Sequence, residues 1–195
     1  MKITWKGFMN EKNLFSYPDL PGDAKKLSSD KSAWAVYLLI IPVLIIAYIG
    51  IKLRLPYVTG PMFTKWAALA GVVLSVPFLV IHEFIHAACC PRNSEILLYV
   101  TPAGICLIPT CPLSKRRYLI MAMMPTIVLG ICPFLIWLST PEFNVQVSSI
   151  LFGFSLGSLS TCIGDIYNVI LASAKMTAKS VLVTSGRDCY YFEKL

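Results

Sequence analysis

Apolar and polar stretches alternate along this chain in a way that is typical of a membrane protein. About 20 consecutive apolar residues are needed for a helix to cross the hydrocarbon core of a bilayer. Four stretches reach this length, at residues 33–51, 63–90, 118–139 and 147–174. The pattern predicts an all-α membrane protein with about four transmembrane helices. Residues 1–32 would form a cytosolic polar leader, residues 33–175 the four-span membrane domain, and residues 176–195 a cytosolic C-terminal tail.

The pattern changes between the second and third predicted helices. Two β-prone runs, at residues 96–100 and 105–108, flank a turn at residues 101–104 that contains Pro and Gly. We therefore expect a short β-hairpin at the membrane interface. Its exposed edge could hold a substrate extended by main-chain hydrogen bonds, or the segment could be a simple apolar interfacial loop.

Composition supports a membrane location and excludes an ordinary soluble domain. Of the 195 residues, 56% are hydrophobic and only 14% are charged, and the mean hydropathy is +0.70. Lys and Arg gather near both ends of the chain and between the second and third spans, whereas residues 140–146 contain neither. By the positive-inside rule, both termini of a multi-pass protein of the cell membrane would be cytosolic. The net charge of +7 then reflects topology and anionic lipids, so nucleic acid is not an expected partner.

Both histidines of the chain lie in one pentapeptide of the second apolar stretch. It reads His82-Glu83-Phe84-Ile85-His86. Residues four apart lie on the same face of a helix, so the two imidazoles can bind one zinc ion. Glu83 is then placed to activate a zinc-bound water as a general base. The motif predicts a hydrolytic zinc site and not merely a metal clamp.

A third protein ligand must come from elsewhere in the chain. Asp165 lies about as deep in the fourth stretch as His82 lies in the second, and both predicted helices run toward the cytosol. Glu83 and Asp165 are the only acids well inside a predicted span, where an unpartnered charge costs about 2.5 to 3.5 kcal/mol. We predict that zinc is held by His82, His86 and Asp165, with Cys89 and Glu95 as alternatives for the third position.

The fourth stretch also carries small residues at helical spacing. Gly153 and Gly157 have the small-xxx-small spacing that lets two helices approach closely. We expect this face to pack against the second predicted helix, although a dimer of two copies would use the same feature.

These residues resemble a known type of enzyme. A membrane-embedded HEFIH motif followed by a later span with an aspartate looks like the site-2 protease type of intramembrane zinc metalloprotease. HEFIH together with the Gly-Asp-Ile-Tyr-Asn stretch at residues 164–168 is most similar to the putative zincin peptidase family of small multi-pass membrane proteins. The resemblance covers roughly residues 64–175. It implies a zinc peptidase with a ligand role for Asp165.

The chain departs from the site-2 protease pattern around this aspartate. Those enzymes usually carry it in a Leu-Asp-Gly context after an Asn-Pro element, whereas here Gly164 precedes Asp165 and Ile166 follows it. The metal role carries over to Asp165, but the substrate contacts do not. Asn168 lies three residues further on the same helical face, where it could bind substrate or serve as a packing amide.

The site and the resemblance together predict an intramembrane zinc-dependent endopeptidase that cleaves transmembrane or membrane-associated proteins. Zn²⁺ is the expected cofactor, and the lipid bilayer and a protein substrate are the expected partners. Two alternatives remain: a non-catalytic zincin-like membrane scaffold and a metal-ion transporter. The first and third apolar stretches contain no charged residue, which disfavours a transport path lined with polar groups at several depths.

Overall fold

The computed structural model of the chain describes residues 2–18, 20–28, 38–102, 104–141 and 144–193. The chain forms two compact units. The first comprises Met1–Ser32, Val80–Met124 and Asp165–Leu195, and the second comprises Ala33–Leu79 and Pro125–Gly164. Both terminal segments belong to the same unit as the HEFIH motif.

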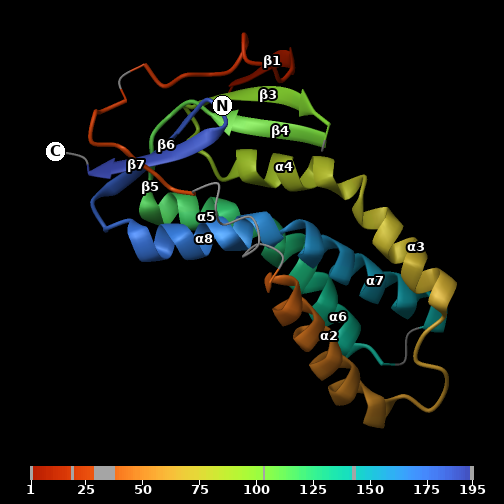
Figure 1. Cartoon of the computed structure of the whole chain (residues 1–195). Coiled ribbons are helices and arrows are strands. Elements are labelled where there is room, and N and C mark those ends of the chain that lie inside the picture. Colours follow the sequence, from red (N-terminus) through yellow and green to blue (C-terminus); the bar gives the residue numbers. More distant parts are fainter. Residues whose placement is uncertain (1, 19, 29–37, 103, 142–143, 194–195) are drawn as a thin grey trace. The chain divides into compact units, whose positions relative to one another are not determined.

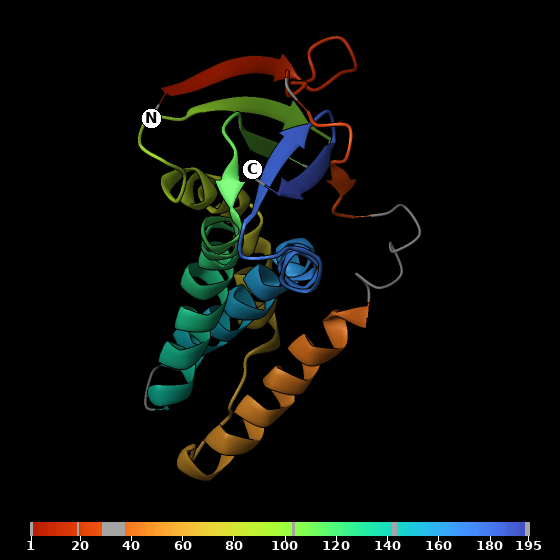
Figure 2. The ribbon, with the colours of Figure 1, turned by 90° about the vertical axis from the view of Figure 1, so that its left-hand side faces the viewer.

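A three-stranded sheet in the first unit is built around the predicted hairpin. Its order is β1-β3-β4, with β1 at Lys2–Phe8, β3 at Glu95–Thr101 and β4 at Gly104–Pro109. The hairpin is confirmed, because β3 and β4 pair antiparallel with Leu98 opposite Leu107. The N-terminal strand β1 adds parallel to β3, and the two lie side by side in Figure 2. Strand β4 is therefore left as an edge of this sheet.

Helix α4, at Phe78–Ala88, packs against this sheet. Ala87 at its end and Cys90 just beyond it are buried together with Ile96 of β3 and Leu107 of β4. Burial of these apolar side chains fixes α4 beside the β4 edge. The helix that carries HEFIH is thus held against a strand edge, as Figure 1 shows for α4 and β4.

A second, four-stranded sheet in the same unit has the order β2-β7-β6-β5. Its strands are β2 at Lys25–Lys26, β7 at Asp188–Glu193, β6 at Ser180–Ser185 and β5 at Leu113–Ser114. Its apolar core includes Leu182 and Leu113 together with Tyr118 of α5, at Lys115–Pro125, and Ala172 of α8, at Ile163–Lys175. The C-terminal tail is therefore a strand hairpin packed on two helices.

The prediction of an all-α fold is wrong. Residues 2–8 and 180–193 were predicted to be part of a polar leader and a tail, but they form strands of the two sheets. Residues 2–6 alternate polar and apolar side chains, and residues 180–193 form a local hairpin of two short strands. Each run is short, and its place in a sheet depends on distant partners, β3 for β1 and β5 for β6.

The second unit has only helical elements of secondary structure among its described residues. It contains α2 at Ile40–Arg54, a short 3₁₀ turn at Leu55–Tyr57, α3 at Lys65–Ser75, a π-helical segment at Thr126–Ile131, α6 at Cys132–Ser139 and α7 at Val145–Thr161. Helices α3 and α7 lie side by side (Figure 1). A Cβ added to Gly153 of α7 would collide with the backbone of Ala68 in α3, and one added to Gly157 would collide with Ser75. This confirms the predicted packing of the small-residue face on the second predicted helix.

Helix lengths are consistent with a membrane protein. Among the described residues, Ile40–Tyr57 and Lys115–Ser139 are each long and apolar enough to cross a bilayer. Two pairs of shorter helices, Lys65–Ser75 with Phe78–Ala88 and Val145–Thr161 with Ile163–Lys175, raise the number to four if each bent pair is one span. Pro77 lies at the break between α3 and α4, where its missing N–H ends the hydrogen-bond ladder of a helix. Two to four spans are therefore compatible with the structure.

Candidate metal centre

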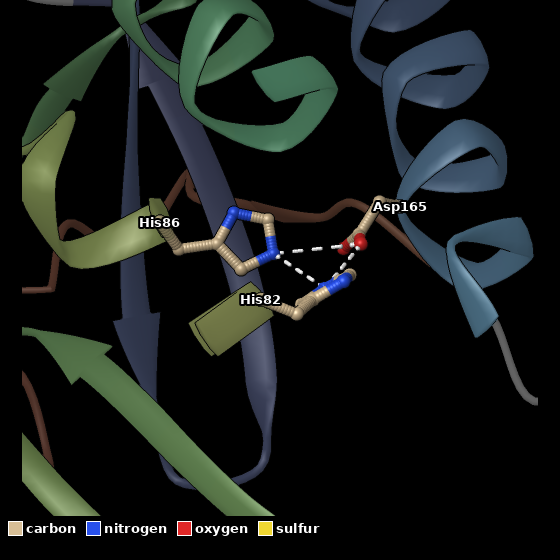
Figure 3. Close-up of side chains that lie close together, drawn as sticks. All are labelled: His82, His86 and Asp165. Atoms are coloured by element: carbon tan, nitrogen blue, oxygen red, sulfur yellow. Dashed lines mark hydrogen bonds and ion pairs between the residues drawn. The ribbon is translucent and has the colours of Figure 1, made fainter. Parts of the chain in front are cut away.

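Three metal-binding side chains converge within the first unit. His82 and His86 come from α4, and Asp165 comes from the first turn of α8. Figure 3 shows the two imidazoles and the carboxylate pointing toward one another. The His82 Nε2 atom lies 2.9 Å from Asp165 Oδ2, and His86 Nε2 lies 3.4 Å from the same oxygen. The two Nε2 atoms are 3.1 Å apart.

These distances fit a tetrahedral zinc site. Zinc binds histidine nitrogen and carboxylate oxygen at about 2.0 to 2.2 Å, which places neighbouring ligand atoms of a tetrahedron about 3.3 Å apart. The three observed separations, between 2.9 and 3.4 Å, are close to that value. Two nitrogens and one oxygen leave a fourth position open, as in catalytic zinc sites.

A backbone carbonyl orients His86 for this role. The Met121 carbonyl oxygen lies 2.9 Å from His86 Nδ1. A carbonyl can only accept, so Nδ1 carries the proton and Nε2 keeps its lone pair. That lone pair faces His82 Nε2 and the carboxylate of Asp165. Electron-rich atoms this close stabilise one another only when a cation or a proton lies between them, and a hydrogen bond to the outer nitrogen is typical of metal-bound histidines.

Glu83 lies beside the cluster and is held by strand β4. Its Oε2 accepts a hydrogen bond of 3.0 Å from the backbone N–H of Leu107. The residue follows His82 on α4, so its carboxylate is directed to the strand edge while both imidazoles are directed to Asp165. A general base needs this arrangement, because it must stand next to the metal without being one of its ligands.

The alternative third ligands lie outside the cluster. Among the described residues, the one group of three or more metal-binding side chains is His82, His86 and Asp165. Glu95 lies on β3, where it accepts a hydrogen bond of 2.6 Å from Thr4 Oγ1. Cys89 follows the end of α4 and is not part of this cluster.

Asn168 shares α8 with Asp165 and is half-buried. No hydrogen bond of its side chain is seen within the described part of the chain, so its substrate role stays a prediction. Two further groups at the site are main-chain atoms, the Met121 carbonyl and the Leu107 N–H. The side-chain types in the sequence could not have identified these main-chain groups. Only the predicted hairpin indicated that a strand edge lies near the site.

The chain was compared with protein families, with curated proteins and with solved structures. Residues 75–180, more than half of the chain, match the model of a family described as "Putative zincin peptidase". The chain belongs to this family. The matched segment of the zincin-family protein includes α4 and the first turn of α8, and therefore all four residues of the site. No curated protein and no solved structure matches the chain. Membership of this family supports zinc-dependent peptide hydrolysis as the general class of reaction.

Proposed function

We propose that this zincin-family protein is an intramembrane zinc-dependent endopeptidase of the site-2 protease type. The observation that carries the proposal is the convergence of His82, His86 and Asp165, with donor atoms 2.9 to 3.4 Å apart, in a chain of the zincin family. These three residues would hold the metal. Zinc, when bound, supplies a Lewis acid that activates water and polarises the scissile carbonyl.

Glu83 would carry the protons of the reaction. As general base it accepts a proton from the attacking water, and as general acid it returns that proton to the leaving amine. The Leu107 N–H, 3.0 Å from its Oε2, would hold the carboxylate at the right place. The His86 imidazole would stay fixed by the Met121 carbonyl, so that both ligands of α4 keep their orientation.

The free edge of β4 would align the substrate. Thr110 N–H donates to Glu95 O across the β3–β4 pair, whereas Leu107 N–H points to Glu83. Main-chain groups alternate in direction along a strand, so Ile105 and Leu107 face away from β3. The N–H and C=O of Ile105 and the C=O of Leu107 can pair with an extended peptide, while the Leu107 N–H stays bound to Glu83. The scissile bond of a substrate strand added there would pass beside Glu83, and Asn168 would contribute a polar contact.

The substrates would be transmembrane or membrane-associated proteins. This proposal is supported by the two to four helices that are able to span a bilayer. The basic residues near both termini also support it, because they favour cytosolic ends by the positive-inside rule. A transmembrane helix must unwind before a protease can cut it, and a strand edge beside the base is suited to hold the unwound segment.

The experiment compares the parent protein with three variants in detergent or nanodiscs. Bound zinc and cleavage of a panel of membrane-protein substrates are measured for Glu83→Gln, His86→Ala and the matched control Glu95→Gln. Glu83→Gln should keep zinc and lose cleavage by about 10² to 10⁴-fold, the usual contribution of a general base. His86→Ala should lose both zinc and cleavage. Glu95→Gln removes a carboxylate outside the cluster and should keep both.

Two outcomes contradict the proposal. Unchanged cleavage by Glu83→Gln would exclude the proposed base. A parent protein that binds zinc tightly but cleaves no member of the panel, with Glu83→Gln indistinguishable from it, would favour the non-catalytic scaffold.

A further inference from the structure

The second unit contains a buried cation that is only partly satisfied. Arg54, the last residue of α2, is 2% exposed. Its Nη2 donates to the Thr140 carbonyl at 3.0 Å, and its guanidinium lies 4.6 Å from the centre of the Trp137 ring. Within the described part of the chain, Nε and Nη1 are buried and have no hydrogen-bond acceptor. Burying a charge with unpaired donors costs several kcal/mol unless an anion compensates it.

A cavity of about 360 Å³ lies beside Arg54. It is lined by Arg54, by residues 57–62, by Pro141 and by Val145 and Ser148 of α7. The hydroxyl of Ser148 is buried and also lacks a partner among the described residues. The N-terminus of α7, capped by Asn144, adds the positive end of a helix dipole. Among the described residues, the lining contains no acidic side chain. The Arg54 guanidinium, the Ser148 hydroxyl and the N-terminus of α7 therefore favour an oxyanion.

The surroundings of the cavity indicate where this oxyanion comes from. Tyr57 and Trp66, on either side of the cavity-lining loop, are 71% and 79% exposed. Exposed Tyr and Trp near the ends of apolar helices are typical of the headgroup level of a bilayer. The outward faces of α2 and α3 are apolar, including Leu44, Ile45, Leu69 and Val73.

We propose that Arg54 and Ser148 form a binding site for the phosphate group of an anionic phospholipid. The planar guanidinium matches the oxygens of a phosphate, and Trp137 keeps its plane in position. The Ser148 hydroxyl donates to a further phosphate oxygen, while the acyl chains lie along the apolar helices outside. No residue of this site takes part in the proposed peptidase reaction, so either idea can fail without the other.

The test measures thermal unfolding of the full-length protein in a neutral detergent at constant ionic strength. Dihexanoylphosphatidylglycerol is titrated against the parent and against Arg54→Gln, Arg54→Lys, Ser148→Ala and Lys52→Gln. The parent should be stabilised in a saturable manner. Arg54→Gln and Ser148→Ala should weaken the apparent affinity by at least about tenfold, because each removes a hydrogen bond to a charged group. Lys52→Gln loses the same charge from an exposed position near the end of the same helix and should bind within about twofold of the parent.

Two further ligands identify the source of the oxyanion. Dihexanoylglycerol has the same chains and no phosphate, and inorganic phosphate has no chains. Neither should stabilise the parent as phosphatidylglycerol does. Equal stabilisation by dihexanoylglycerol would overturn the phosphate site, and stabilisation by inorganic phosphate alone would overturn lipid as the ligand.

The nearest acid in the sequence provides the competing explanation. Glu142 follows Pro141 in the chain, and Glu142→Gln tests whether Arg54 pairs with this carboxylate. If phosphatidylglycerol has no effect on the parent while Glu142→Gln and Arg54→Gln destabilise it equally, the site is overturned in favour of an internal ion pair. Should Arg54→Gln fail to fold, Ser148→Ala and Arg54→Lys decide the matter, since unchanged affinity in both would contradict the proposal.

Discussion

His86 shows how a main-chain contact fixes the orientation of a proposed metal ligand. Its Nδ1 is tied to the Met121 carbonyl, which leaves Nε2 to face His82 and Asp165. The HEFIH motif predicts that both imidazoles share a helix face, and they do. The direction of each ring depends on a main-chain oxygen of another helix, and the sequence has no signal for that contact.

Substitution of Asp165 tests the third ligand at this scale. Asp165→Asn replaces a charged oxygen ligand by a neutral amide of the same shape, so zinc affinity should fall by more than about tenfold. Competition with a chelator of known affinity measures this change. Asp188→Asn is the matched control, because Asp188 is paired with Lys26 on the surface and should leave zinc affinity unchanged. Parental affinity in Asp165→Asn would return Cys89 and Glu95 as candidates.

At the scale of elements, strand β4 connects the sheet to the site. Its inner main-chain groups pair with β3, and its outer N–H at Leu107 binds Glu83. The Pro/Gly turn at residues 101–104 was enough to predict the hairpin. Which residues of β4 turn their N–H groups away from β3 was not predictable from the sequence. A shift of one residue in the strand pairing would have turned the Leu107 N–H toward β3.

Proline substitution separates the roles of the two outward N–H groups. Leu107→Pro removes the donor to Glu83 but no ladder hydrogen bond, which an edge strand tolerates. We expect kcat to fall by about 10 to 100-fold with zinc content unchanged, since a hydrogen bond to a charged group contributes about 1.5 to 3 kcal/mol. Ile105→Pro removes the neighbouring outward N–H and should raise KM with little effect on kcat. Steady-state kinetics distinguishes the two, and identical effects of both variants would exclude a separate role for Leu107.

Close packing of α3 on α7 gives a second prediction for elements. Gly153→Ala forces a methyl group onto the Ala68 backbone, which cannot rotate away as a side chain can. We expect a destabilisation of about 1 to 3 kcal/mol, typical of overpacking, measured by thermal or denaturant unfolding in detergent. Gly164→Ala is the control, because a Cβ there meets no atom within 4 Å. An equally stable Gly153→Ala variant would contradict the close approach of these helices.

At the scale of the whole molecule, the proposed zinc ligands come from parts of the chain that are 79 residues apart, at positions 86 and 165. A bound metal therefore links α4 to α8 in the folded state and has no preformed site in the unfolded chain. Binding energy of this kind adds directly to folding stability. The same unit includes both terminal segments, so its folding requires residues from the two ends of the sequence.

Metal removal tests this coupling. Chelation of zinc should lower the free energy of unfolding of the parent by about 2.7 kcal/mol if zinc had been present at 100 times its Kd. Unfolding of His86→Ala should be insensitive to the chelator. A thermal melt with and without chelator, followed by return of zinc in excess, measures both. A parent whose unfolding temperature does not respond would contradict a site shared by α4 and α8.

Local order along the chain was sufficient for the presence of apolar helices, for the β3–β4 hairpin and for the placing of His82 and His86 on one helix face, because helical periodicity and turn chemistry act over a few residues. Asp165 could be anticipated only by its unusual charge in an apolar stretch. The pairing of β1 with β3 and of β6 with β5, the Met121 and Leu107 contacts and the burial of Arg54 were decided by tertiary structure. Each of these depends on pairing or packing between distant segments, and that pairing is determined by the fold as a whole.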